Sequence, residues 1–192
     1  MAIKLVSTRD AAAIQGVKML VSGPPGAGKT RLCATLPNPI ILSAESGLLS
    51  LAECDLPAIE IKHILSNELS QTKDPRKAYG ALSDHMTKLV RTFRDMPGKH
   101  IYMAAKQNRI QDELSNALLY GLSTPGKKLA NDLPYLFDEC FALRAEKDAE
   151  GNIQRWLQTQ RDAQYDAKDR SGKLEMFEPA DLGAIIKKIV GE

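Results

Sequence analysis

A glycine-rich string that ends in a lysine and a threonine carries the clearest chemistry in this chain of 192 residues. It reads GPPGAGKT and fits the pattern G-x-x-x-x-G-K-[S/T] of a phosphate-binding loop, or P-loop. Glycines let main-chain N–H groups approach phosphate oxygens closely, because no Cβ stands in the way. Lys29 would reach the β- and γ-phosphates of ATP, and the Thr30 hydroxyl would bind Mg²⁺. The predicted nucleotide-binding residues are Gly23, Pro24, Pro25, Gly26, Ala27, Gly28, Lys29, Thr30 and Arg31, with Thr30 as the metal ligand.

Two polar residues follow apolar runs that are typical of strands, and they are candidates to act on the same phosphates. Ligands of open α/β sheets bind beyond the carboxyl ends of the strands, where Glu45 and Gln107 are expected. Glu45 would orient a water molecule for attack on the γ-phosphate, and Gln107 would hydrogen-bond that phosphate. Taken alone, Glu45 also fits a surface or capping acid, and Gln107 also fits an ordinary loop amide.

Two groups of cations are candidates for binding anions outside the P-loop. Lys168 and Arg170 are two residues apart, so on an extended chain both side chains point to one side. A phosphate bound by a neighbouring subunit is one anion that they would reach. Arg109, Lys127 and Lys128 lie in or near the segment after the candidate glutamine, where they would touch a nucleic-acid backbone. A solvated charge cluster is the open alternative for both groups.

An acid at the end of an apolar strand, which P-loop enzymes use to hold Mg²⁺, is hard to find here. No hydrophobic strand that ends in Asp occurs between Ala58 and His100. The superficial match YLFDE follows Pro134, and a proline disfavours a central strand. We therefore interpret Asp138 and Glu139 as structural residues.

The elements that must position these residues alternate between strand and helix over the first two thirds of the chain. Apolar runs predict strands at 17–21, 39–44, 58–62 and 100–105, and periodic stretches predict helices at 30–36, 79–96 and 110–120. Residues 66–77 are predicted to be a linker, and 123–128 a loop.

In the last third of the chain the pattern changes from alternating strands and helices to consecutive strands. Alternating residues at 141–146 and 153–160 flank a turn, which predicts a β-hairpin, and a further strand is predicted at 164–168. A closing helix has Pro179 in its first turn. The sequence thus predicts an α/β fold, with a mainly parallel sheet and a C-terminal antiparallel β-hairpin extension.

The composition is that of an ordinary globular chain, with 43% hydrophobic and 26% charged residues. A net charge of +2 argues neither for nor against nucleic acid as a partner. The three cysteines are scattered, which indicates reduced thiols in a cytosolic protein, and the three histidines lack metal-ligand spacing. No apolar run reaches the roughly 18 residues of a membrane span.

Several blocks beyond the P-loop resemble a known family. They read IILSAESGLLSL, KDPRKAYGAL, HIYMAAKQNR, TPGKKLANDLPYLFDE and YDAKDRSGKL. With the P-loop they are similar to the phage-encoded AAA-type nucleotide-binding proteins, the RecA-like, Sak-type single-strand annealing recombinases. This resemblance implies a single RecA-like P-loop ATPase domain over residues 1–192, with ATP and Mg²⁺ as cofactors and single-stranded DNA as partner. It also implies homo-oligomers with ATP at the subunit interfaces, in the cytoplasm of a bacterial host.

The resemblance assigns roles to the candidate residues. Glu45 looks like the catalytic glutamate after the second strand, and Gln107 looks like the residue that senses the γ-phosphate at the start of a DNA-binding loop. The three cations of that loop then look like DNA contacts. Lys168 and Arg170 look like cationic fingers that reach ATP in the adjacent subunit.

One block of the family pattern is missing from this sequence. Family members carry an apolar strand ending in Asp-Ser ahead of the KDPR block, whereas here 59–63 passes almost directly into 67–70. A strand that bears the Mg²⁺-supporting acid therefore looks absent between about residues 60 and 75, and Asp138 is the outside candidate to replace that acid.

We expect an ATPase that acts on single-stranded DNA in phage recombination or annealing. The alternative is a nucleotide-gated DNA-binding module with little or no hydrolysis. A small-molecule kinase is a third reading, which the lack of an arginine-rich lid disfavours.

Overall fold

The centre of the molecule is a buried strand, β1 (Lys18–Gly23), that lies between β4 (Ile101–Gln111) and β6 (Glu139–Lys147). The computed structural model describes residues 16–43, 48–60, 75–111, 116–124 and 127–191. Both neighbours pair with β1 in parallel. All six residues of β1 are buried, as expected for a strand that is covered on both faces of its sheet.

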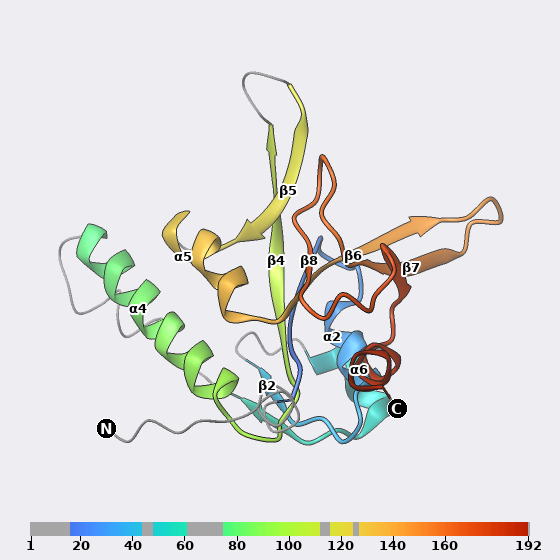
Figure 1. The fold of residues 1–192 in the computed structure, drawn as a ribbon, viewed down its shortest axis with the longest axis horizontal. Coiled ribbons are helices and arrows are strands. Elements are labelled where there is room, and N and C mark those ends of the chain that lie inside the picture. Colours follow the sequence, from blue (N-terminus) through green and yellow to red (C-terminus); the bar gives the residue numbers. More distant parts are fainter. Residues whose placement is uncertain (1–15, 44–47, 61–74, 112–115, 125–126, 192) are drawn as a thin grey trace.

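Antiparallel strands extend this parallel centre on both sides (Figure 1). On one side β5 (Leu118–Ser123) pairs with the carboxyl-terminal half of β4. On the other side β7 (Ile153–Gln158) and the short β8 (Lys168–Asp169) both pair with β6, and β9 (Phe177–Pro179) pairs with β7. The protein is therefore a mixed α/β fold, and the parallel strand pairs of its main sheet are those of β1 with β4 and β6.

A second, two-stranded sheet is formed by β2 (Ile41–Ser43) and β3 (Ala58–Glu60), which pair in parallel with each other. A 3-10 helix, η2 (Leu48–Cys54), lies between them in the chain. The edge of β4 that faces away from β1 pairs with β5 only from Lys106 onward. Within the described ranges, residues 101–105 have no strand partner on that edge. The stretch in which the sequence predicts a missing strand lies mostly outside the described residues.

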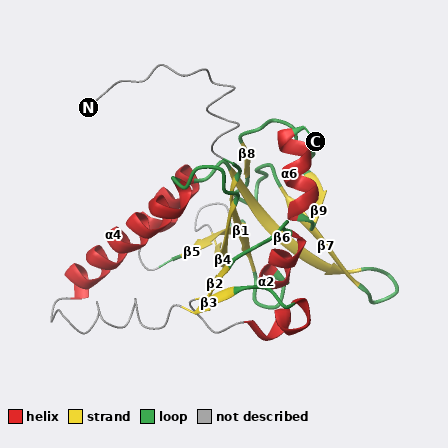
Figure 2. Ribbon diagram, turned by 90° about the horizontal axis from the view of Figure 1, so that it is seen from below, coloured by secondary structure: helices red, strands yellow, loops and turns green. Residues whose placement is uncertain are grey.

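Helices cover the two faces of the main sheet (Figure 2). One face carries α2 (Lys29–Leu32), the 3-10 turn η1 (Cys33–Thr35) and α6 (Leu182–Val190). The other face carries α4 (Pro75–Arg94), α5 (Lys127–Asp132) and η3 (Leu133–Leu136). None of the described helices is long and apolar enough to cross a membrane.

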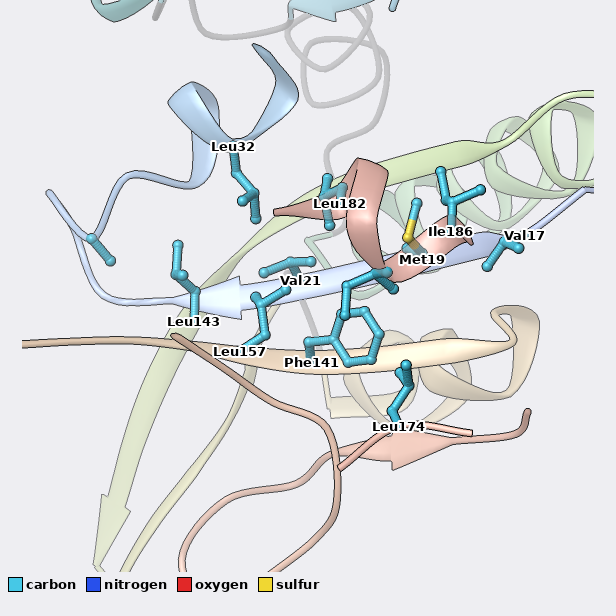
Figure 3. Close-up of a cluster of buried hydrophobic side chains, with 12 residues drawn as sticks. Val17, Met19, Val21, Leu32, Phe141, Leu143, Leu157, Leu174, Leu182 and Ile186 are labelled. Atoms are coloured by element: carbon cyan, nitrogen blue, oxygen red, sulfur yellow. The ribbon is translucent and has the colours of Figure 1, made fainter. Parts of the chain in front are cut away.

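Alternate residues of β1 belong to two separate clusters of buried side chains. Figure 3 shows the first cluster, in which side chains of α2 and α6 meet those of β1, β6 and β7. Its members are Val17, Met19, Val21, Ala27, Leu32, Phe141, Leu143, Leu157, Leu174, Leu182, Ile185 and Ile186. The members of the second cluster, on the opposite face, are Leu20, Val90, Leu129, Leu133, Phe137 and Cys140. The packing of both faces fixes β1, and therefore the loop that follows it. All three cysteines are free thiols, as the sequence predicts.

The structure corrects three local predictions. The helix expected at 110–120 is wrong, because β4 continues to Gln111 and residues 118–123 form β5, with Arg109 opposite Tyr120. The linker expected at 66–77 already gives way to α4 at Pro75, a residue that suits the first turn of a helix. The loop expected at 123–128 ends where α5 begins, at Lys127.

Candidate functional site

The P-loop lies at the carboxyl end of β1 and leads directly into α2. Its turn is closed by the Ala27 N–H, which donates to the Pro24 carbonyl at 3.3 Å. The helix begins where the Leu32 N–H donates to the Gly28 carbonyl at 3.0 Å. Ligands of open α/β sheets bind at this end of the strands, so the geometry places the loop where its sequence motif requires it.

Two glycines of the loop have backbone conformations that other residues rarely adopt. The φ angle is 76° at Gly26 and 100° at Gly28. An L-residue with a Cβ is disfavoured at such positive values, so these positions require glycine for the loop to form. Pro24, Pro25 and Gly26 are exposed, whereas Ala27 is buried in the core and anchors the loop.

Lys29 and Thr30, the two chemical side chains of the loop, are half-buried at the start of α2. The Lys29 ammonium donates to the carbonyls of Gly23 at 2.7 Å and Pro24 at 2.8 Å, so it lies against the loop itself. Tyr102 of β4 donates its hydroxyl to the Lys29 carbonyl at 2.6 Å and thereby ties α2 to the sheet. Burial raises the pKa of Tyr102 well above its ordinary value, so this hydroxyl stays protonated as the donor.

Arg155 of β7 contacts the P-loop, and the sequence does not predict this contact. Its Nε donates to the Ala27 carbonyl at 2.9 Å. A Cβ built on Gly28 would lie only 3.1 Å from the same nitrogen. The two partners of this hydrogen bond are 128 residues apart in the chain, and no pattern in the sequence joins them.

Gln107 lies on β4, one residue beyond the point where Lys106 pairs with Gly23 at the end of β1. It is half-buried, and its side-chain amide nitrogen is buried with no hydrogen-bond partner in the described part of the chain. An unsatisfied buried donor costs about 1–3 kcal/mol, which a protein tolerates mainly where another partner completes the site. A phosphate oxygen is an acceptor that suits such a donor.

These residues suit the phosphates of a nucleotide better than they suit a metal ion. The loop offers main-chain N–H groups, one ammonium and one buried amide donor, which together suit a polyanion. For Mg²⁺ the described residues supply the Thr30 hydroxyl, and they contain no group of three His, Cys, Asp or Glu side chains that would hold a metal ion. Glu45, the predicted catalytic acid, lies outside the described residues.

Asp138 and Glu139 lie at the amino end of β6, which is the opposite end of the sheet from the P-loop. The Lys18 N–H, at the start of β1, donates to Asp138 at 3.1 Å. Five residues of strand, or about 16 Å, separate Lys18 from Gly23. Asp138 therefore cannot replace the Mg²⁺-supporting acid at this chain's own P-loop, and the suggestion that it does so is wrong.

Lys168 and Arg170 are brought to the same end of the sheet by the pairing of β8 with β6. The Lys168 ammonium donates to the carbonyls of Pro134 at 2.7 Å and Phe137 at 2.6 Å. Arg170 forms an ion pair with Asp138 at 3.0 Å, and its side chain is 58% exposed. Neither cation reaches the P-loop of its own chain.

The predicted DNA contacts lie on and beside the β4–β5 hairpin, which extends past the end of β1 (Figure 1). Arg109 is exposed on β4, three residues or about 10 Å beyond the pairing with Gly23. Lys127 begins α5, and Lys128 is exposed on it. On the neighbouring strand Tyr120 stacks on Tyr165, with ring centroids 4.6 Å apart, and this aromatic pair was not predicted.

A comparison with protein families gives one match. The model of a family described as an AAA domain matches residues 15–74 and 62–171, which include the P-loop, β1, β4 and β6. A search of curated proteins finds no match. The family implies nucleotide binding, in agreement with the geometry of the loop. Because the matched residues make up most of the chain, the protein belongs to the AAA-domain family.

Proposed function

We propose that this protein binds ATP with Mg²⁺ in its P-loop and uses the nucleotide to control its contact with single-stranded DNA during phage recombination or annealing. The observation that carries the nucleotide part is the loop at the carboxyl end of β1, with two glycines at positive φ and Lys29 beside them. Lys29 would exchange its bonds to the loop carbonyls for bonds to phosphate oxygens. The Thr30 hydroxyl would contribute to the Mg²⁺ site.

Support for a link between nucleotide and DNA comes from the single strand β4. Gln107, whose buried amide nitrogen has no hydrogen-bond partner among the described residues, is separated by one residue from the exposed Arg109. A phosphate that accepts from Gln107 would fix the base of the hairpin on which Arg109 lies. Arg109, Lys127 and Lys128 would then contact the DNA backbone, whose binding depends on charge neutralisation.

An alternative function, a nucleotide-gated module with little or no hydrolysis, is favoured by a specific observation. Asp138 lies at the wrong end of the sheet to support Mg²⁺, and the described residues hold no cluster of metal-binding side chains. The two matched family segments also overlap at residues 62–74, within the stretch where the acid-bearing strand looks absent. Glu45 would remain as the acid for hydrolysis.

Calorimetric titration with ATP and ADP tests the nucleotide part. The wild-type protein is expected to bind both, and Lys29→Ala is expected to lose binding at least tenfold, because it removes the ammonium that faces the phosphates. Lys147→Ala is the matched control, since Lys147 is an exposed lysine at the end of β6. If titration of Lys29→Ala with nucleotide gave the same binding heat as titration of the wild type, this result would contradict the proposal.

Two further measurements separate the alternatives. Binding of single-stranded DNA is measured with and without ATP at several salt concentrations, and the affinity should rise with ATP and fall as salt rises. Release of inorganic phosphate is then measured with and without the DNA. Turnover that DNA stimulates supports the ATPase, whereas ATP-dependent DNA binding without turnover supports the gated module.

A further inference from the structure

The P-loop is held from outside by Arg155, which reaches it from β7. In the β6–β7 pairing, Leu143 lies opposite Leu157 and Ala145 lies opposite Arg155. The Leu143 carbonyl lies 3.1 Å from a Cβ built on Gly23. Arg155 is therefore two residues further toward the P-loop end of the sheet, alongside the loop rather than alongside β1.

This contact fixes the orientation of one peptide group. The Ala27 carbonyl and the Gly28 N–H belong to the same planar trans peptide, so they point in opposite directions. Because Arg155 Nε donates to the Ala27 carbonyl at 2.9 Å, that carbonyl faces β7. The Gly28 N–H consequently faces away from β7.

Arg155 also brings a positive charge to the loop, and none of the described carboxylates forms an ion pair with it. Arg161, another exposed arginine, does pair with an acid, Asp166, at 3.3 Å. A guanidinium beside an anion-binding loop strengthens the attraction for a polyanion.

We infer that Arg155 is a positioning residue for nucleotide binding, which holds the Ala27–Gly28 peptide so that the Gly28 N–H faces a phosphate bound in the loop. The inference rests on the proposed binding of nucleotide by the P-loop. It differs from the predicted role of Lys168 and Arg170, because Arg155 acts on the P-loop of its own chain. Arg155 is also close to Gly28 itself, since a Cβ built there would lie 3.1 Å from the Arg155 Nε.

The test compares Arg155→Met and Arg155→Lys with Arg161→Gln, the control at an exposed arginine. Titration with ADP is expected to show at least a tenfold loss of affinity for Arg155→Met, partial recovery for Arg155→Lys, and wild-type affinity for Arg161→Gln. In protein labelled with nitrogen-15, the shift of the Gly28 amide resonance on addition of ADP should shrink in Arg155→Met. Arg155 is exposed, so its variants should unfold at the wild-type temperature without nucleotide.

The outcomes are distinguishable from those of the proposed function. Wild-type affinity for ADP in Arg155→Met would overturn this inference and leave nucleotide binding intact. A loss that Arg155→Lys does not recover, with a lowered unfolding temperature, would assign Arg155 a purely structural role and also overturn it. Absence of binding by the wild type, equal to that of Lys29→Ala, would overturn the proposed function and this inference with it.

Discussion

Glu139 is a carboxyl group that the fold buries at the amino end of β6, where only 1% of the residue is exposed. Main-chain N–H groups of Arg170 and Ser171 donate to it, each at 3.2 Å. Burial, and then the charge of Asp169, raise the pKa of Glu139 from 4.5 to about 7. Burial alone would also raise the pKa of Asp169, but hydrogen bonds from Ser171 and two main-chain amides lower it. Below about pH 7 Glu139 therefore keeps its proton while Asp169 is ionised.

The stability of the protein should depend on pH through Glu139. Between pH 4.5 and about 7 the folded protein keeps a proton that the unfolded chain has released. The free energy of unfolding consequently falls as pH rises through this window and levels off above it. We expect the wild type to lose about 3 kcal/mol, because each unit of pKa shift corresponds to about 1.4 kcal/mol.

Urea unfolding at pH 5, 6, 7 and 8 measures this effect. Glu139→Gln cannot ionise, so its loss of stability over the same range should be less than half that of the wild type. Glu146→Gln, at an exposed glutamate of the same strand, is the control and should follow the wild type. Parallel curves for wild type and Glu139→Gln would show that Glu139 does not titrate as described.

How far individual site residues are predictable depends on whether they are neighbours in the chain. The P-loop is contiguous, so its motif and the strand before it were visible in the sequence. Tyr102 and Arg155 contact the loop from residues 73 and 128 positions away, and only the pairing of the strands brings them there. The positions of Lys168 and Arg170 at the far end of the sheet depend on β8, which is two residues long and overlaps the strand predicted at 164–168 only at Lys168.

At the scale of elements, the contact between α6 and η1 depends on one glycine. The Leu182 N–H donates to the Thr35 hydroxyl at 2.8 Å, and Asp181 caps the helix by accepting from the Ala184 N–H at 3.0 Å. A Cβ on Gly183 would lie 2.6 Å from the Thr35 carbonyl. The first turn of α6 therefore packs directly against the main chain that follows the P-loop helix.

Alanine at two helical glycines should have opposite effects on stability. Gly183→Ala should lower the free energy of unfolding by about 1–3 kcal/mol, because α6 must move away from η1. Gly80→Ala, in α4, should raise it by up to about 1 kcal/mol, because its Cβ meets nothing within 4 Å and alanine favours helix. Urea unfolding of the two variants measures both changes, and a shift of the same sign in both would contradict the packing described for α6.

Elements with a long apolar pattern are predicted well from the sequence, whereas elements that depend on pairing with another strand are not. The buried run of β1 and the apolar face of α4 carry enough periodic residues to identify them. The sequence predicts a helix at 110–120 because a short stretch of mixed residues is ambiguous, whereas the pairing of 106–111 with 118–123 makes 110–111 and 118–120 parts of strands. The separate sheet of β2 and β3 was not predicted either, because periodicity indicates a strand but not its neighbour.

At the scale of the whole molecule, two predicted parts of an ATP site lie at opposite ends of one sheet. One part is the P-loop, and the other is the pair of candidate fingers, Lys168 and Arg170. Arg170 is the better of the two candidate fingers, since its side chain is 58% exposed, whereas the Lys168 ammonium is held by two carbonyls. We expect Arg170→Ala to bind ATP with wild-type affinity but to lose most of its turnover, because the arginine would act only on the ATP of a neighbouring copy.

Mixing of variants tests this shared site. An equimolar mixture of Lys29→Ala and Arg170→Ala forms some interfaces with both residues intact, so it should recover roughly a quarter of the wild-type turnover when copies assemble at random. Each variant alone should show little ATP turnover. Turnover of the mixture equal to the mean of the separate variants would contradict a site built from two copies.

The separation of Arg170 from the P-loop along β1 also restricts how copies are able to associate. A twofold dimer brings Arg170 of each copy to the P-loop of the other only if a single interface covers both ends of β1. A head-to-tail series needs no such wide interface, because it joins the Arg170 end of one copy to the P-loop end of the next. Such a series either closes into a ring or grows as a filament, and in both cases it has a direction that it would impose on a strand of DNA lying along it.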